Sequence, residues 1–289
     1  MKIKILIPVY NDWQSVFKLV DEIDSLSNSS EYELSIIIVN DASNHDRDET
    51  VKEYNNLKSI KILNMKINQG HARCIATGLK YINEKEDYDY IIPMDGDGED
   101  RPEEILQFIE NINTSNNKPI VGERVKRSES LLFQICYKIH KLITLVFTGH
   151  TIKFGNFTCL PRDTVEKITK EKATWNSFSG ALKKIEKDLI KVPSVRGSRY
   201  FGLSKMSFKN LITHSLSIIS VFRKTVLFRS ALFIVFYILL IKSNASIITL
   251  IPFVLLLIMI YSISSLSLRE NIDEYNNSLK NIEDVINLK

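Results

Sequence analysis

Apolar segments alternate with amphipathic ones through the first hundred residues, and this alternation limits the possible folds more than any other feature of the chain. Apolar, β-branched runs are typical of buried strands, and they occupy residues 2–9, 33–39, 59–63 and 88–94. Helical patterns separate them at residues 13–26, at 46–55 and in a segment that ends at Ile82. Strands that alternate with helices at this spacing predict a parallel, doubly wound α/β sheet.

Acidic and amide side chains follow three of these predicted strands. Asp41 comes after the second strand, Asn68 after the third and Asp95 after the fourth. Ligands of doubly wound sheets bind outside the carboxyl ends of the strands, so we expect these three side chains to gather on one edge. At the start of the chain, Asp12 is expected to cap the helix that begins at Trp13.

Asp95 and Asp97 stand one residue apart directly after a buried strand, with glycines at positions 96 and 98. Two carboxylates this close repel each other unless a cation holds them. Mg²⁺ and Mn²⁺ take oxygen ligands, usually one or two carboxylates plus substrate phosphates. The pair therefore predicts a divalent-metal site that Pro102 and the following helix would close. An acidic surface turn is the alternative, because Asp and Gly are common turn residues.

The charge of the chain is unevenly placed, although its net value is only +4. No acidic residue lies between Asp188 and Glu270, whereas ten lysines and arginines do. This asymmetry says more about the binding partners than the net charge does, and we expect no nucleic acid among them. The three cysteines show no CxxC spacing, which favours reduced thiols in a cytoplasmic protein; these are Cys74, Cys136 and Cys159.

Four motifs occur in the order and spacing typical of one enzyme family. They are Ile7-Pro-Val-Tyr-Asn11, Val39-Asn-Asp-Ala-Ser43, Asn68-x-Gly70 with Ala76-x-Gly78, and Asp95-x-Asp97. Together they resemble family 2 glycosyltransferases of GT-A fold. The resemblance implies a nucleotide-diphosphate-sugar donor and a divalent metal, Mg²⁺ or Mn²⁺, held by the catalytic pair Asp95 and Asp97. It also implies the donor-binding residues, which are Pro8, Tyr10, Asn11, Asp41, Asn68, Gly70, Arg73, Asp95, Gly96 and Asp97.

Asp41 resembles the carboxylate that reads the nucleobase in this family. Its alternative role is that of a turn residue that caps the next helix, since caps and sites use the same residue types.

Further segments resemble a subgroup, the polyprenyl-phosphate sugar transferases of the dolichol-phosphate type. They are residues 95–103, Val121–Arg127, Phe154–Phe157 with Arg162, and Arg199–Lys205, so the likeness spans about residues 3–206. The chain departs from the subgroup at Glu99, where the subgroup has Gln, and at Arg101, where Pro is frequent.

The resemblance implies an acceptor phosphate bound by basic and hydroxyl side chains. Arginine binds phosphate oxygens as a fork and lysine as a point charge. Solvated surface charge is the alternative for each of them. The candidates are Arg124, Arg127, Arg199, Ser204 and Lys205.

One absence also bears on the acceptor. Transferases that act on a hydroxyl need a general base, and the corresponding region, Ala173–Leu182, contains no carboxylate. A phosphate is already ionised near neutral pH and needs no base. The sequence therefore favours a phosphate as the nucleophile.

The last third of the chain becomes apolar. Residues 208–222 show helical spacing of apolar side chains, which predicts an amphipathic helix on a membrane or, alternatively, a core helix. Residues 226–241 and the uncharged residues 245–268 then predict two membrane spans, the first of marginal length. The basic residues that flank the two predicted spans outnumber Lys242, which lies between the spans. Both termini are therefore expected in the cytoplasm.

The predicted organisation is a GT-A domain at 1–206, a juxtamembrane helix at 207–224, a membrane hairpin at 225–269 and a polar cytoplasmic tail at 270–289, with a short helix. Transfer of a sugar to a polyprenyl phosphate at the cytoplasmic membrane is the favoured function, with membrane lipids as partners. Two alternatives remain, transfer to a glycan or lipid hydroxyl and an inactive protein that binds nucleotide-sugar. A homo-oligomer also stays open.

Overall fold

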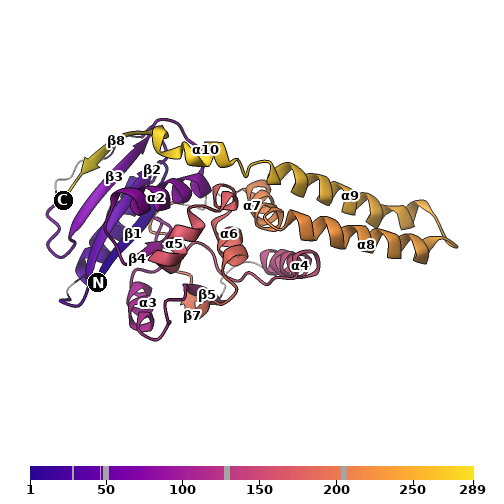
Figure 1. Ribbon diagram of the computed structural model, residues 1–289, viewed down its shortest axis with the longest axis horizontal. Coiled ribbons are helices and arrows are strands. Elements are labelled where there is room, and N and C mark those ends of the chain that lie inside the picture. Colours follow the sequence, from indigo (N-terminus) through magenta and orange to yellow (C-terminus); the bar gives the residue numbers. More distant parts are fainter. Residues whose placement is uncertain (28, 46, 48–51, 127–130, 203–206) are drawn as a thin grey trace.

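The structure is a computed structural model, and it describes residues 1–289 except 28, 46, 48–51, 127–130 and 203–206. Its described strands form one sheet in the order β7-β5-β6-β4-β1-β2-β3-β8 (Figure 1). The strands are β1 (Lys2–Val9), β2 (Glu33–Asn40), β3 (Ser59–Met65), β4 (Tyr90–Pro93), β5 (Ile120–Lys126), β6 (Thr158–Pro161), β7 (Ile190–Val195) and β8 (Ile282–Asn287).

The central strands confirm the predicted parallel sheet. β1 pairs in parallel with β2 and β4, and β2 pairs in parallel with β3. Antiparallel pairs occur further out, where β6 joins β4 to β5 and where β8 covers β3. Because β1 to β4 run in one direction, their carboxyl ends meet at one edge, and Asp41, Asn68 and Asp95 follow strands at that edge.

Helices cover both faces of the sheet because side chains of a strand alternate between its faces. Ile3, Ile5 and Ile7 of β1 belong to the core under α1 and α3, whereas Leu6 belongs to the core under α2. The helices of this part are α1 (Trp13–Leu26), α2 (His71–Lys85), α3 (Glu104–Ile112), α4 (Leu131–Thr148), α5 (Arg162–Ile168), the 3₁₀ turn η1 (Lys172–Trp175) and α6 (Phe178–Ile185).

Gly78 allows α2 to lie close to the sheet. A Cβ atom at this position would lie 2.3 Å from Cδ1 of Leu6 and 3.0 Å from Cγ2 of Val39, both in the core. We expect Gly78→Ala to lower the free energy of unfolding by about 1–3 kcal/mol, because the added methyl group overpacks the site. Denaturant unfolding in detergent measures this change. Glu84→Ala, at an exposed position of the same helix, is the control and should change stability little.

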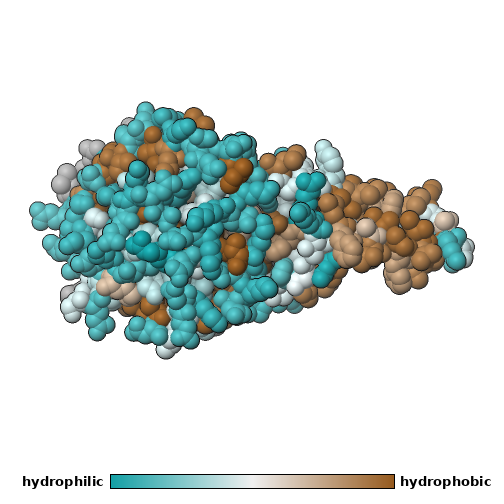
Figure 2. All heavy atoms as spheres, in the orientation of Figure 1, coloured by the Kyte–Doolittle hydropathy of each residue, from teal (hydrophilic) through white to brown (hydrophobic). Residues whose placement is uncertain are grey.

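Two long helices form a hairpin that projects from the α/β part (Figure 1). They are α8 (Arg223–Ile241) and α9 (Ile247–Ser267), and they follow α7 (Phe208–Ser220). Both are long and apolar enough to cross a membrane, and only 11% of the most apolar window of each is buried inside the molecule. Figure 2 shows their surface as an almost continuous hydrophobic projection beside a hydrophilic domain.

Arg229 is a charged residue within the apolar helix α8, and the structure gives it partners. Its guanidinium Nη1 donates to the carbonyl oxygens of Val146 (2.8 Å) and Leu145 (3.4 Å) in the last turn of α4. A cation at the carboxyl end of a helix is favoured by the unpaired carbonyls and by the helix dipole. Arg229 therefore ties the base of the hairpin to α4.

The segment after the hairpin corrects one prediction. Residues 270–289 were predicted as a separate polar tail, and the short helix is present as α10 (Ile272–Asn276). The segment then continues through η2 (Ser278–Asn281) into β8, which pairs antiparallel with β3. It is therefore part of the sheet of the α/β domain.

Three smaller predictions also need comment. Of the predicted helix at 46–55, Arg47 and Lys52–Asn55 form no helix, and the other positions lie outside the described residues. The fourth strand is shorter than the predicted run 88–94. In α7, the last residues, Ser217–Ser220, are buried in the molecule, so the core alternative holds for this end of the predicted membrane-surface helix.

Candidate active site

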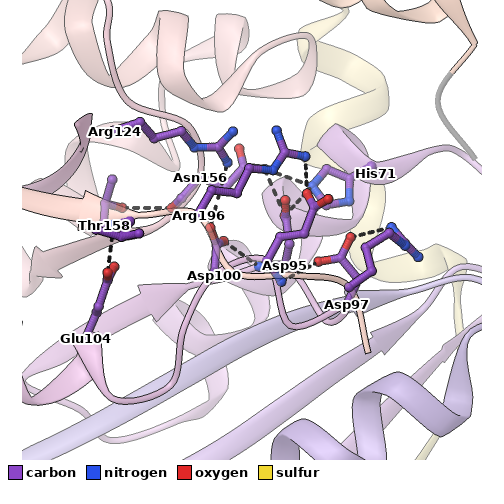
Figure 3. A network of polar contacts seen from close by, with 12 residues as sticks. His71, Asp95, Asp97, Asp100, Glu104, Arg124, Asn156, Thr158 and Arg196 are labelled. Carbon is purple, nitrogen blue, oxygen red and sulfur yellow. Dashed lines mark hydrogen bonds and ion pairs between the residues drawn. The ribbon is translucent and has the colours of Figure 1, made fainter. Parts of the chain in front are cut away.

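In the acidic turn after β4, backbone N–H groups donate hydrogen bonds to carboxylates of the same turn (Figure 3). The backbone N–H of Asp95 donates to Oδ2 of Asp100 (2.9 Å), and that of Glu99 donates to Oδ1 of Asp97 (3.0 Å). Gly98 has φ +86°, a conformation that an L side chain rarely adopts. The glycine and the local hydrogen bonds explain why the chain folds back here and places three aspartates close together.

Two neutral or weakly basic side chains contact Asp95. Its Oδ1 lies 3.1 Å from Nε2 of His71, in the first turn of α2, and accepts a hydrogen bond from Nδ2 of Asn156 (3.2 Å). Burial favours the neutral acid, but His71 and Asn156 outweigh it, so the pKa of Asp95 lies well below its usual range. Asp95 is therefore ionised near neutral pH.

The other two aspartates of the turn are shifted in the opposite direction. Burial and the charge of Asp95 raise the pKa of Asp97 and raise the pKa of Asp100 to about 7. Mutual repulsion of this kind is relieved by a nearby positive charge.

Arginines from two other segments supply part of that charge. Arg199 donates from Nη1 to Oδ2 of Asp97 (2.5 Å) and from Nη2 to Oδ2 of Asp12 (2.9 Å). Arg124 of β5 lies 3.8 Å from Oδ1 of Asp100. The Asp12 carboxylate thus binds Arg199 and the hydroxyl of Ser15, and it does not make the predicted side-chain cap of α1.

The acid cluster consists of Asp12, Asp95, Asp97, Glu99 and Asp100. Its five carboxylates meet three guanidinium groups, those of Arg124, Arg196 and Arg199. Within the described ranges no three His, Cys, Asp or Glu side chains are arranged to hold a metal ion by themselves. Two carboxylates completed by substrate phosphates are sufficient for Mg²⁺, so the donor set fits a divalent cation that arrives with its substrate.

Asp41 lies at the same edge and is only 3% exposed. Its two carboxylate oxygens accept hydrogen bonds from the backbone N–H groups of Gln69 and Gly70, each at 2.8 Å. Gly70 has φ +95° and is the N-cap residue of α2. Asp41 therefore holds the loop before α2 against the end of β2.

The remaining donor-site predictions are placed as follows. Asn11 has φ +52°, and its side-chain Oδ1 accepts hydrogen bonds from the backbone N–H groups of Asn44 (3.0 Å) and His45 (3.1 Å). These bonds fix the loop after β2. Pro8 is buried in β1, and Tyr10 and Asn68 are exposed at the strand ends. Gly96 provides space for α1, because a Cβ atom there would lie 2.8 Å from Cγ2 of Val16.

Arg73 lies beside α10 and η1 and not in the acid cluster. Its guanidinium contacts Glu274 of α10 (3.2 Å) and lies over the ring of Trp175, 5.1 Å from the centroid. Of the predicted acceptor residues, Arg124 and Arg199 reach the acid cluster, whereas Arg127, Ser204 and Lys205 lie outside the described residues. Arg162, part of the same sequence pattern, pairs instead with Asp87.

Sequence reasoning missed six residues of this site, namely Asp12, His71, Glu99, Asp100, Asn156 and Arg196. Asp100 could have been found, because it is a third acid in the same short turn. His71 is a single polar residue without a pattern, and Asn156 lies in the Phe154–Phe157 segment without being predicted as a site residue. Only the fold brings the two side chains to Asp95.

Residues 4–160, more than half of the chain, match the model of a known family. The chain belongs to glycosyl transferase family 2. Among curated relatives of this family 2 chain, undecaprenyl-phosphate 4-deoxy-4-formamido-L-arabinose transferase of Klebsiella pneumoniae is 24% identical over 225 residues. The match covers 73% of the chain and 64% of that relative, so the chain spans less than two thirds of its length. An uncharacterised protein of Methanocaldococcus jannaschii is 23% identical over 160 residues, which cover 53% of the chain and 67% of the relative.

Solved structures show the same GT-A fold as this family 2 chain. Glucosyl-3-phosphoglycerate synthase from Mycobacterium tuberculosis, in complex with Mn²⁺, UDP-glucose and phosphoglyceric acid, aligns with a TM-score of 0.55 at 10% identity, over 79% of both chains. S. aureus TarS in complex with UDP-GlcNAc aligns with a TM-score of 0.52 at 13% identity, over 97% of this chain and 91% of that one.

Proposed function

We propose that this family 2 glycosyltransferase moves a sugar, with inversion, from a nucleotide-diphosphate-sugar to a polyprenyl phosphate at a membrane surface. The observation that carries the proposal is the position of Arg199. This residue contacts Asp97 of the acid cluster and lies nine residues before the first helix that leads into the apolar hairpin. The cluster and the hairpin are thus joined by one short segment.

The donor side of the proposal is supported by the arrangement at the strand ends. Asp41 and the Gln69–Gly70 loop would bind the nucleoside, and the acid cluster would face the diphosphate. Structural neighbours crystallised with UDP-sugars agree with such a donor. A divalent cation held by Asp95 and Asp97 would supply the positive charge that stabilises the departing diphosphate.

The acceptor side is supported by two of the three arginines at the cluster, Arg199 and Arg124, and by the name of the Klebsiella relative. An acceptor phosphate oxygen would attack the anomeric carbon as the bond to the donor diphosphate breaks. Arg199 would orient that phosphate, and its buried Nε has no hydrogen-bond partner among the described residues. Arg124 would add charge from the β5 side.

The choice of a phosphate acceptor also depends on whether the site contains a general base that could activate a hydroxyl acceptor. The structure amends the sequence argument, because α10 brings the carboxylate of Glu274 to Trp175, in the region where none was expected. That carboxylate is paired with Arg73 at 3.2 Å and accepts the indole N–H at 2.9 Å. Arg73 and Trp175 engage Oε2 of Glu274 and Asn271 donates to Oε1, so both oxygens already have partners and the phosphate nucleophile stays the better proposal.

Membrane attachment is supported by the hairpin and by α4. Helices of 19 and 21 residues are about 28 and 31 Å long, close to the hydrocarbon thickness of a bilayer. At the base of the hairpin, α4 exposes further apolar side chains, which continue the apolar surface; these are Ile139, Leu142, Leu145 and Val146. Exposed apolar surface of this extent is expected to contact lipid.

The test is an assay of purified protein with a panel of labelled nucleotide-sugars and with undecaprenyl phosphate or dolichyl phosphate. We expect a sugar-phosphate-lipid that mild acid cleaves, and little transfer to the matching polyprenol without phosphate. A product that resists mild acid and carries the sugar on a hydroxyl would reject the phosphate acceptor.

The topology gives a separate prediction. Because β8 belongs to the same sheet as β1, the residues on both sides of the hairpin must lie on one side of the membrane. Tags before Met1 and after Lys289 should both be accessible from the cytoplasm, as the distribution of Arg and Lys indicates, and a tag at Asn244 only from the opposite face. Protease protection in oriented vesicles measures this. A tag at Asn244 that is accessible from the cytoplasm would show that α8 and α9 do not span.

A further inference from the structure

The segment after the hairpin contacts the α/β domain on either side of the loop before α2. On one side, the backbone N–H of Lys66 donates to the carbonyl oxygen of Asn281 (2.8 Å), and its Nζ donates to that of Lys280 (2.8 Å). On the other side, Tyr275 of α10 is fully buried and stacks on Trp175, with ring centroids 5.5 Å apart. Together with the ion pair between Arg73 and Glu274, these contacts hold both ends of the chain from Lys66 to the first turn of α2 against residues 270–289.

Glu274 makes the contact at the second end. Its Oε2 accepts the indole N–H of Trp175 (2.9 Å) and lies 3.2 Å from Nη2 of Arg73, while Oε1 accepts from Asn271 (3.1 Å). One carboxylate therefore joins α10, η1 and the first turn of α2. Among the described residues, Arg73 and Glu274 form the one ion pair between α2 and residues 270–289.

The segment between these two contacts carries most of the donor-side geometry. Gln69 and Gly70 donate to Asp41, and His71 lies 3.1 Å from Asp95. Arg73 is two residues beyond His71 in the same helical turn. A small rotation of this turn moves all of these groups together, and displacements of about 1 Å are enough to weaken binding at a preorganised site.

We propose that Glu274 is a positioning residue for the donor site, which acts through Arg73 and the first turn of α2. Residues 270–289, which follow the hairpin, then help to position the groups that bind the nucleotide-sugar. This inference rests on the proposed function only in taking a nucleotide-sugar as the ligand.

Substrate kinetics provide the first test, with Glu274→Gln compared with Glu283→Gln. The Glu274→Gln side chain still accepts the Trp175 N–H but loses the charge that holds Arg73. Glu283 is exposed on β8 and makes no ion pair or side-chain hydrogen bond with α2 in the part of the chain that the structure describes. We expect Glu274→Gln to raise the KM for the nucleotide-sugar about five- to tenfold with kcat within about twofold, and Glu283→Gln to match the natural protein. The double variant Arg73→Gln/Glu274→Gln should be no worse than either single variant.

Hydrogen exchange provides a second test that does not depend on the identity of the donor or acceptor. In the full-length protein without ligand, Glu274→Gln should increase amide exchange in residues 66–77 and leave β5 and β7 unchanged. Unchanged exchange in residues 66–77 would overturn the positioning role, even if the protein transfers sugar. Increased exchange there in a protein that transfers no sugar would reject the proposed function and keep the positioning role. A uniform increase with a lower Tm would show that Glu274 only stabilises the fold.

Discussion

Asp97→Asn should reduce sugar transfer at least about 1,000-fold, because the acid cluster loses one of the two carboxylates proposed to hold the cation at the diphosphate. The fold should persist. Burial and the charge of Asp95 raise the pKa of Asp97, so a neutral side chain relieves repulsion there, and Arg199 keeps Asp12 as a partner. Initial rates with saturating Mn²⁺, together with the thermal unfolding midpoint, measure both effects.

Asp188→Asn is the matched control for this variant. Its carboxylate is 78% exposed, and its contact with Lys118 is long, at 3.5 Å, so the substitution should change neither rate nor stability appreciably. Full activity of Asp97→Asn would remove Asp97 from the reaction and leave the acidic turn as a structural feature.

Arg199→Ala is expected to have two opposite effects. The guanidinium donates to Oδ2 of Asp97 at 2.5 Å, so a divalent cation held by Asp97 would compete with it for this carboxylate. Without it, Mn²⁺ should bind several-fold more tightly to the protein alone, since a competing cation has been removed. Transfer to polyprenyl phosphate should nevertheless fall about ten- to a hundredfold, because one charge-assisted contact to the acceptor phosphate is lost.

Mn²⁺ binding by electron paramagnetic resonance and initial transfer rates separate the two effects. Arg199→Lys should retain part of the transfer activity as a point charge. Arg101→Ala, at a half-exposed arginine near the same turn, is the control and should leave both measurements unchanged. Weaker Mn²⁺ binding in Arg199→Ala would mean that Arg199 supports the metal site instead of competing for it.

The parallel part of the fold could be predicted from the sequence because its strands are buried on both faces. Such strands appear as continuous apolar runs, and β1 and β2 are examples. The strand β8 could not be predicted in this way. Its sequence, Ile-Glu-Asp-Val-Ile-Asn, is mostly exposed, and its partner β3 lies more than 200 residues earlier. Pairing over that distance leaves no local signal.

The candidate site was predictable where chemistry depends on neighbours in the sequence. Asp95 and Asp97 form a pair that repels itself, and this pattern is visible without a structure. The family resemblance implies Arg73 as a donor-binding residue, but its partner Glu274 comes from residues 270–289. Contacts of this kind depend on how α9 returns to the domain, which local periodicity does not encode.

The order of the strands has a consequence for how each molecule is made. β8 follows α8 and α9 in the sequence, so the ribosome completes both apolar helices before it delivers the strand that covers β3. Until then β3 has a free edge, and free edges are sites where chains aggregate. Newly made chains therefore close the sheet only after the hairpin exists. A chain that has not yet added β8 keeps this edge bare, and unpaired strand edges of this kind are among the reasons that partly folded chains need chaperones.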